Sequence, residues 1–284
     1  MDINAHTQFC GVIGNPVEHS LSPAIHNAAF QKLGLNFVYL AFRVEAIGDA
    51  IKGLRALGNF RGASVTIPHK VAAVPFLDAI EPTARHIGAI NTIVAVGETL
   101  TGYNTDAIGA LRALREGGVA LKGQHVVILG SGGAARAIAF SLGAEAGIGR
   151  LTILGIDSQE RTTLAQDLQS KTGMAVRESP LDEGTLREIL PDTHVLIHCT
   201  PMGMSPNVHK TSVPAALLHA GLTVMDIVYN PRSTQLLKDA NAVGCRVIPG
   251  LEMFLHQASA QFELWTNQAA PTDVMRAVLE SRLP

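Results

Sequence analysis

The segment 122–157, KGQHVVILGSGGAARAIAFSLGAEAGIGRLTILGID, constrains the fold more than any other part of the chain. It reads as a buried strand, a glycine turn, a helix of small apolar residues and a second strand, which together form one βαβ unit. Parallel strands need such a crossover helix, and parallel sheets are covered by helices. The segment therefore predicts an open α/β sheet of the Rossmann type.

Three residues of this segment, Gly130, Gly132 and Ala135, match the G-x-G-x-x-G/A pattern of dinucleotide-binding turns, with Gly133 and Ala134 between them. The pattern stands where its chemistry requires it, after a strand and at the start of a helix. Glycines permit a tight turn, and the N–H groups at a helix N-terminus stabilise a pyrophosphate. The alternative is a tight turn that binds nothing, and the flanking strands and helix count against it.

Two charged residues after the second predicted strand bear on the choice of cofactor. Asp157 stands where an acidic side chain binds the adenosine ribose hydroxyls and repels a 2′-phosphate, which favours NAD. Arg161 is close enough in sequence to reach such a phosphate, and Asp157 has a second interpretation as the cap of the next helix. We therefore predict NAD, with NADP as the alternative.

Strand and helix patterns alternate along almost the whole chain, which predicts an α/β fold. Before the βαβ unit we expect strands at 9–14, 36–44, 62–67 and 89–96, helices at 22–34 (with Ser22 as N-cap), 45–58 and 69–78 (broken by Pro75), and a turn at 97–102. A helix at 106–118 leads into the unit, which is followed by strands at 193–200, 222–228 and 245–249 and helices at 250–268 and 271–283. With 284 residues, the chain is long for one core, so we expect two domains.

The composition excludes some classes of function. A net charge of -2 with 16% charged residues gives no basic footprint for nucleic acid. No apolar run approaches the roughly 20 residues that span a bilayer, and the N-terminus lacks a targeting pattern, so we expect a cytoplasmic protein. Cys10, Cys199 and Cys245 are widely spaced, which predicts reduced thiols and no metal site.

Several polar residues follow predicted strands, where open α/β sheets bind ligands. Serine hydroxyls can donate to a carboxylate, amide and hydroxyl groups can hold ring hydroxyls, and a lysine with an aspartate can transfer a proton. The candidates in these three roles are Ser20 and Ser22; Thr66, Asn91 and Gln257; and Lys70 and Asp106. Each also has a structural interpretation, as a helix cap or a solvated side chain.

Seven motifs in order, GVIGNPVEHSLSPAIHNAAF, VTIPHK, GAINTIV, GYNTDAIG, GSGGAARA, TPMGM and GLEMFLHQ, resemble the shikimate dehydrogenase family and its quinate/shikimate dehydrogenase relatives. The resemblance spans almost the whole chain. It implies an oxidoreductase that interconverts shikimate and 3-dehydroshikimate, or quinate and 3-dehydroquinate, with a nicotinamide cofactor. Two α/β domains follow: a substrate-binding catalytic domain at 1–103, and a Rossmann-type dinucleotide-binding domain at 104–249. The C-terminal helices of 250–284 are expected to return to the first.

The resemblance also assigns roles to particular residues. Lys70 matches the catalytic lysine and Asp106 its partner, and which of the two carries the proton stays open. Ser20 and Ser22 match the serines that bind the substrate carboxylate. The other implied substrate contacts are Thr66, Asn91, Gln257 and Tyr229, with Met253 beside them, and the implied cofactor contacts include Thr200, Met202 and Gly250. His19, His26, His69 and Cys199 are interpreted as structural neighbours.

Three departures from the family pattern bear on substrate and cofactor. Ser64 replaces the usual asparagine of NVT, which puts one substrate contact in doubt. Gly155–Asp157 replaces the NRT of NADP-using members, which favours NAD. Ser22 resembles shikimate-specific members, whereas TPMGM and Asp157 resemble the NAD-linked quinate/shikimate type. We expect an NAD-preferring shikimate dehydrogenase, monomeric or homodimeric, for which quinate or an amino analogue is a candidate additional substrate. The alternatives are an NADP-linked biosynthetic enzyme and a non-catalytic metabolite sensor.

Overall fold

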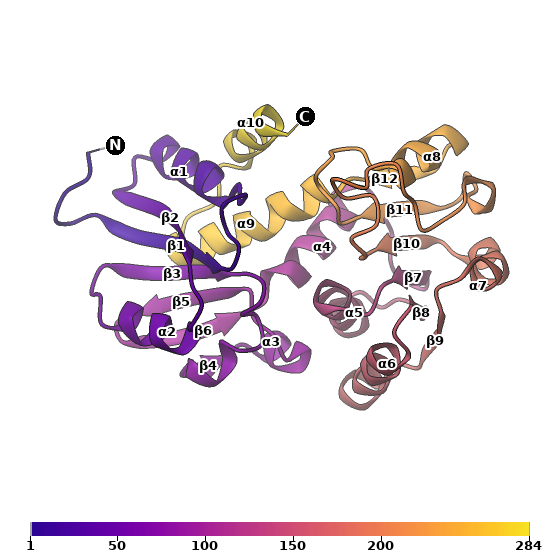
Figure 1. Ribbon diagram of the computed structural model, residues 1–284, viewed down its shortest axis with the longest axis horizontal. Coiled ribbons are helices and arrows are strands. Elements are labelled where there is room, and N and C mark those ends of the chain that lie inside the picture. Colours follow the sequence, from indigo (N-terminus) through magenta and orange to yellow (C-terminus); the bar gives the residue numbers. More distant parts are fainter. Residues whose placement is uncertain (1, 284) are drawn as a thin grey trace. The chain divides into compact units, whose positions relative to one another are not determined.

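The computed structural model describes residues 2–283, and the chain divides into two compact units (Figure 1). The first unit combines the residues up to Thr105 with Gln257–Arg282, and the second is built on Asp106–His256. Each unit contains its own six-stranded sheet. The predicted α/β fold with two sheet-containing parts is confirmed.

The first unit has a mixed sheet with the strand order β2-β1-β3-β5-β6-β4. Its strands are β1 (Gln8–Gly14), β2 (Phe37–Arg43), β3 (Phe60–Val65), β4 (Ala79–Ile80), β5 (Thr92–Val96) and β6 (Thr99–Tyr103). Its helices are α1 (Ser22–Lys32), α2 (Ile47–Arg55), α3 (Pro82–Ile87), most of α9 (Gly250–Thr266) and α10 (Thr272–Arg282), with a 3₁₀ turn η1 (Val74–Phe76). Strands β1, β2 and β3 are parallel, whereas β5 is antiparallel to β3 and to β6.

Two layers of helices cover this sheet. Ile47 and Ile51 of α2 and Ala84 of α3 belong to the apolar cluster on one face. Aromatic side chains join α1, β2 and α9: Phe30 packs on Phe262 with ring centroids 5.3 Å apart. The helix α10 lies beside α1.

Three sequence-based expectations for this unit are wrong. Residues 69–78 form turns and η1 instead of a helix, because Pro75 lies inside the apolar run, where it removes a backbone donor and its ring clashes with the preceding turn of a helix. The expected turn at 97–102 contains the start of β6, which pairs with β5 as a hairpin. The N-cap of α1 is Leu21, and Ser22 is already the first helical residue.

The second unit has an all-parallel sheet with the order β12-β11-β10-β7-β8-β9. Its strands are β7 (His125–Leu129), β8 (Arg150–Gly155), β9 (Val176–Pro180), β10 (Val195–His198), β11 (Thr223–Asp226) and β12 (Arg246–Ile248). Its helices are α4 (Thr105–Glu116), α5 (Gly133–Glu145), α6 (Ser158–Thr172), α7 (Glu183–Ile189) and α8 (Gln235–Val243), with short 3₁₀ turns η2 (Leu190–Asp192) and η3 (Ala215–Leu217).

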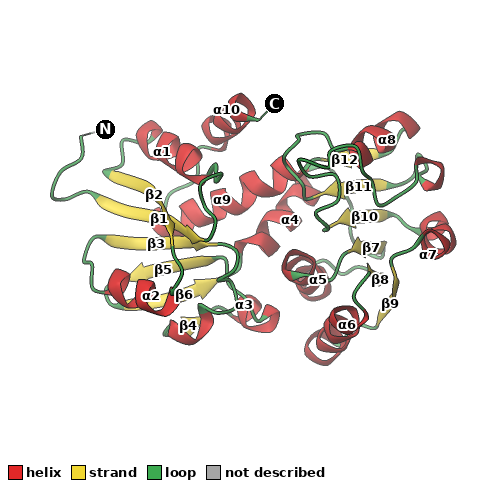
Figure 2. Cartoon of the chain, viewed as in Figure 1, coloured by secondary structure: helices red, strands yellow, loops and turns green. Residues whose placement is uncertain are grey.

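This order is that of a doubly wound dinucleotide-binding sheet. Leu186 of α7 and Leu236 of α8 pack with Val127 and Leu196 in one apolar cluster. The helices α5 and α6 pack on each other and lie on the opposite side of the sheet (Figure 2). From β7 the chain adds β8 and β9 on one side, and it then returns to add β10, β11 and β12 on the other side. Ligands are expected at the carboxyl ends of β7 and β10, where this change occurs.

Candidate active site

The glycine turn after β7 is open toward the N-terminus of α5. Gly130 has a φ of +108°, and a Cβ at this position would come within 3.1 Å of the Cys199 carbonyl oxygen. Gly132 is the N-cap of α5, and a Cβ added to Gly132 or Gly133 would meet no atom within 4 Å. The space beside the first turn of α5 is therefore open at these two glycines, an arrangement that fits the pyrophosphate of a dinucleotide at a helix N-terminus.

The remaining residues of this motif differ in burial. Ala135 is fully buried and faces the protein interior, whereas Ala134 is half-buried beside the turn. A small side chain at both positions lets the helix begin close to the strand that precedes it. In this arrangement only backbone and small side chains border the turn.

Asp157 and Arg161 stand near the carboxyl end of β8 with different roles. The exposed Asp157 accepts a hydrogen bond from the Glu160 backbone N–H at 2.8 Å and is the N-cap of α6. The side chain of Arg161 is buried, pairs with Glu178 and donates to the Gly155 carbonyl at 2.8 Å. The guanidinium is engaged by these partners, so the expectation that Arg161 reaches a phosphate does not fit this geometry.

The loops after β10 and β11 carry further predicted contacts. Thr200 and Met202 follow β10, and the Met202 backbone N–H donates to the Thr200 hydroxyl at 3.2 Å. Gly250 lies so close to the loop after β11 that a Cβ would be 2.5 Å from the carbonyl oxygens of Ile227 and Val228.

Tyr229 extends the same loop into an aromatic contact. Its ring lies 4.8 Å from that of Phe254, and burial raises the pKa of Tyr229. Met253, next to Phe254 on α9, is buried. The Tyr229 hydroxyl is therefore favoured as a neutral hydrogen-bonding group rather than a base.

In the first unit, predicted substrate residues gather at the carboxyl ends of β1 and β3. Ser20 follows β1, and its hydroxyl accepts from the Ser22 backbone N–H at 3.3 Å. Thr66 follows β3, and its backbone N–H donates to the Ile13 carbonyl of β1 at 2.9 Å. The parallel pairing of β1 with β3 places these residues at one edge of the sheet.

Lys70 is tied to the segment that carries Asn91. The Lys70 carbonyl accepts from the Ile90 backbone N–H at 2.9 Å, directly before Asn91. Lys70 is half-buried in a turn, where the backbone contact fixes the start of its side chain.

The amide of Asn91 is held through its oxygen. Oδ1 accepts from the Thr105 backbone N–H at 2.7 Å, from the Thr92 hydroxyl at 2.8 Å and from the Thr105 hydroxyl at 3.1 Å. These three donors assign the orientation of the amide. Asp106, half-buried in the first turn of α4, directly follows Thr105 in the chain.

Ser64 belongs to a buried network that the sequence did not predict. Its hydroxyl lies 2.6 Å from that of Tyr39 and donates to Gln261 Oε1 at 2.8 Å. Gln261 Nε2 donates in turn to the Thr92 hydroxyl at 3.0 Å. A signal existed in the sequence, because Gln261 follows Gln257 by four residues and so shares its face of α9.

Of the four residues interpreted as structural neighbours, His69 and His26 are buried, Cys199 is half-buried, and His19 is exposed. The His69 ring lies 2.7 Å from the Val44 carbonyl through Nε2. His26 is fully buried and stacks on Tyr39 at 4.6 Å, and burial lowers its pKa to about 3. Burial also raises the pKa of the Cys199 thiol, which disfavours the reactive thiolate.

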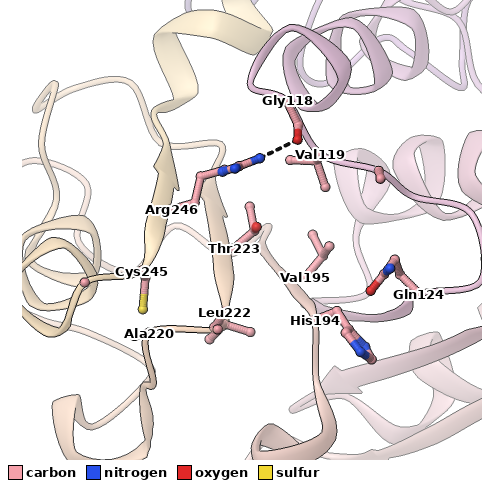
Figure 3. A pocket seen from close by; sticks show the side chains of 13 residues that line it. Gly118, Val119, Gln124, His194, Val195, Ala220, Leu222, Thr223, Cys245 and Arg246 are labelled. Atoms are coloured by element: carbon pink, nitrogen blue, oxygen red, sulfur yellow. Dashed lines mark hydrogen bonds between the residues drawn. The ribbon is translucent and has the colours of Figure 1, made fainter.

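A separate hollow of about 640 Å³ lies at the amino ends of the strands of the parallel sheet, opposite to the carboxyl ends that carry the glycine turn (Figure 3). Its lining comes from the segments that start the strands, including Gln124, His194 and Thr223. Arg246 reaches across its wall to the Gly118 carbonyl. None of the predicted catalytic, substrate or cofactor residues lines this hollow.

The fold and the open glycine turn define a dinucleotide-dependent oxidoreductase. A shikimate dehydrogenase (NADP(+)) of Moorella thermoacetica is 45% identical over 285 residues, covering 100% of this chain and 96% of that protein. The family model of the shikimate dehydrogenase substrate binding domain matches residues 12–93, and that of the shikimate 5'-dehydrogenase C-terminal domain matches residues 250–280. The chain belongs to the shikimate dehydrogenase family.

Two solved structures show the same similarity. A shikimate 5-dehydrogenase from Listeria monocytogenes in complex with shikimate and NAD is 37% identical, with a TM-score of 0.93 and 98% of each chain covered. A quinate dehydrogenase from Corynebacterium glutamicum in complex with NAD is 30% identical, with a TM-score of 0.91 and coverage of 97% of this chain and 99% of that chain.

Proposed function

We propose that this enzyme interconverts shikimate and 3-dehydroshikimate with a nicotinamide dinucleotide. The observation that carries the proposal is the hydrogen bond from the Ile90 N–H to the Lys70 carbonyl, which ties Lys70 to the segment of Asn91. This contact lies near the carboxyl ends of β1 and β3, after which Ser20 and Thr66 follow. One ammonium, two hydroxyls and one amide suit a substrate that is a ring acid with several hydroxyls. The names of the Moorella and Listeria relatives support the same substrate.

Each residue has a distinct part in this proposal. Ser20 and Ser22 bind the carboxylate, and Thr66, Asn91 and Gln257 bind ring hydroxyls. The Lys70 ammonium donates a proton to the carbonyl oxygen during reduction, and its neutral amine accepts that proton during oxidation. Asp106 positions Lys70 and bonds the neighbouring hydroxyl. The nicotinamide, when bound, supplies or accepts the hydride.

The cofactor form has two candidates, each with its own support. NADP is favoured because the curated Moorella relative is named for it. NAD is supported by Asp157, a negative charge at the end of β8, and by the engagement of Arg161 with Glu178. The Listeria structure, which holds NAD, shows that one member of the family binds it.

Quinate is a second candidate substrate, supported by the quinate dehydrogenase from Corynebacterium glutamicum.

A cytoplasmic location is part of the proposal, since all three thiols are free cysteines, as expected in a reducing compartment. Within the described residues, no helix has the length and apolar character to cross a membrane.

The test measures initial rates for shikimate and for quinate, each with NAD and with NADP. Shikimate should be turned over, and Lys70→Ala should lower kcat roughly 10²–10⁴-fold while the dinucleotide Kd stays within twofold. Lys52→Ala is the matched control, because this lysine side chain is 75% exposed. No turnover with any of the four pairs, together with tight dinucleotide binding, would favour the metabolite sensor instead.

A further inference from the structure

A buried histidine and a buried aspartate end two neighbouring strands of the parallel sheet. His198 is the last residue of β10, Asp226 is the last residue of β11, and the two are register partners. His198 Nδ1 lies 2.9 Å from Asp226 Oδ1, and both residues are 0% exposed. A polar pair at such a depth is costly unless every atom finds a partner.

Asp226 gathers donors from the chain that follows β11. Its Oδ1 accepts from the Val228 backbone N–H at 3.0 Å, and its Oδ2 accepts from the Thr234 hydroxyl at 2.6 Å. With the His198 ring as a third donor, both carboxylate oxygens are satisfied. The bond to Val228 fixes the turn that packs against Gly250 and leads to Tyr229.

His198 extends the network to the loop after β10. The Thr200 hydroxyl lies 2.6 Å from Nε2, and in the neutral ring that donates Nδ1–H to Asp226, Nε2 accepts from this hydroxyl. The Thr200 oxygen is then left to accept from the Met202 backbone N–H. Ser212 makes a second, longer contact with Nε2 at 3.2 Å.

The loop after β10 lies directly against the glycine turn. A Cβ on Gly130 would come within 3.1 Å of the Cys199 carbonyl oxygen and 3.3 Å of Thr200 Cγ2. Gly130 follows β7, and Thr200 follows β10, so the contact lies at the point where the strand order reverses. Dinucleotides bind at this point in doubly wound sheets.

We propose that His198 and Asp226 are positioning residues for the dinucleotide. The pair forms hydrogen bonds to the loops after β10 and β11, and these bonds fix the positions of Thr200 and Met202 beside the glycine turn. An apolar pair would fill the same volume but would leave the Thr200 hydroxyl and the Val228 N–H without these partners. The inference concerns cofactor binding and does not depend on which substrate the enzyme uses.

The test compares His198→Asn with Ser212→Ala in the full-length enzyme. An asparagine amide retains a donor near the place of Nδ1 but does not reach Thr200, whereas Ser212→Ala removes only the longer contact of Nε2. We expect His198→Asn to raise the Kd of NADPH and NADH about tenfold, measured by nucleotide fluorescence without substrate. The Kd for Ser212→Ala and the KM of the substrate should stay within twofold. A wild-type Kd for His198→Asn would overturn the proposal.

A second pair of variants covers the case in which His198→Asn does not fold. Thr200→Ser keeps the hydroxyl that bonds to His198 Nε2, and Thr200→Val removes this hydroxyl with little change in the shape of the side chain. The valine variant should weaken dinucleotide binding, and the serine variant should bind as the wild type does; equal affinities would refute the proposal. Where His198→Asn folds, its effect and that of Thr200→Val should not add, and full additivity would show that the Thr200 hydroxyl acts without His198.

Discussion

Asp157 accepts a hydrogen bond from the backbone N–H of Glu160 and thereby caps α6 at the end of β8. One carboxylate therefore has a structural role and also stands where dinucleotide-binding sheets hold the adenosine ribose. The two roles are separable, because asparagine caps a helix about as well as aspartate but carries no charge.

Asp157→Asn should shift the cofactor preference toward NADP. Removing a like charge near the 2′-phosphate should raise the ratio of kcat/KM for NADP to that for NAD roughly tenfold. The control is Asp182→Asn, since Asp182 caps α7 in the same way by accepting from the Thr185 N–H at 2.8 Å. The control should leave the ratio unchanged, and an unchanged ratio in both variants would place the carboxylate away from the phosphate.

Arg161→Met should destabilise the protein without selecting between cofactors. The Arg161 side chain is 9% exposed and that of Glu178 is 30% exposed, so the pair is only partly screened by water. We expect the free energy of unfolding to fall by roughly 1–3 kcal/mol in chemical denaturation, because Glu178 and the Gly155 carbonyl lose their donor.

The matched control for this prediction is Arg177→Met. Arg177 pairs with Glu188 at 2.8 Å, but both side chains are about half exposed or more, so the loss should stay below about 1 kcal/mol. A selective loss of NADP binding in Arg161→Met would show that the arginine leaves Glu178 to bind the phosphate.

Most strands of the parallel sheet could be predicted because burial on both faces gives continuous apolar runs, as in β7. The edge strand β9 was not predicted, because Val176–Pro180 is only half-buried and contains charged residues. The hairpin strand β6 was harder to predict. Its burial alternates along Thr99–Tyr103 with Leu100 inside, but the strand is short, and the glycines at 97 and 102 that flank its first residues are typical of a turn. In residues 69–78 the apolar spacing suggested a helix, but Pro75 inside the segment is incompatible with a continuous one.

The gathering of candidate residues at strand ends could be predicted because topology brings such ends together, as for Ser20 and Thr66. The partners that hold them could not. Ser64 bonds Gln261 across 197 positions of sequence, and His198 bonds Asp226 across 28. A single sequence contains no signal that pairs side chains at these separations, so only the fold assigns them.

Ser64→Ala should show whether the serine that replaces the family's asparagine has a structural role. The change leaves the Tyr39 hydroxyl and Gln261 Oε1 without this partner in a buried site, which should lower the free energy of unfolding by about 2–4 kcal/mol. The KM for shikimate should change less than twofold.

A double-mutant cycle tests the pairing behind this result. Tyr39→Phe removes the other hydroxyl of the 2.6 Å contact. The free energy of unfolding that the double variant loses should therefore be smaller, by about 1 kcal/mol, than the sum of the losses in the two single variants. Strict additivity would mean that the two hydroxyls do not depend on each other, and a large rise in KM would return Ser64 to the substrate site.

The pH dependence of stability should contain a contribution from His26. Burial lowers its pKa in the folded protein to about 3, whereas an unfolded chain has a histidine pKa of about 6.5. The unfolded state therefore binds a proton that the folded state does not bind between these values. Above pH 6.5 the titration of His26 takes nothing from the free energy of unfolding. Below this pH the free energy of unfolding should fall by about 1.4 kcal/mol for each pH unit, down to pH 3.

His26→Phe removes this titration and keeps an aromatic ring against Tyr39, whose ring centroid lies 4.6 Å from that of His26. Urea denaturation between pH 4 and 6 should give a shallower slope of unfolding free energy against pH for the variant, by about one proton. Above pH 7 the two curves should run parallel, because the histidine is then neutral in both states. Equal slopes at acid pH would mean that the folded protein accommodates a charged His26, which contradicts its full burial.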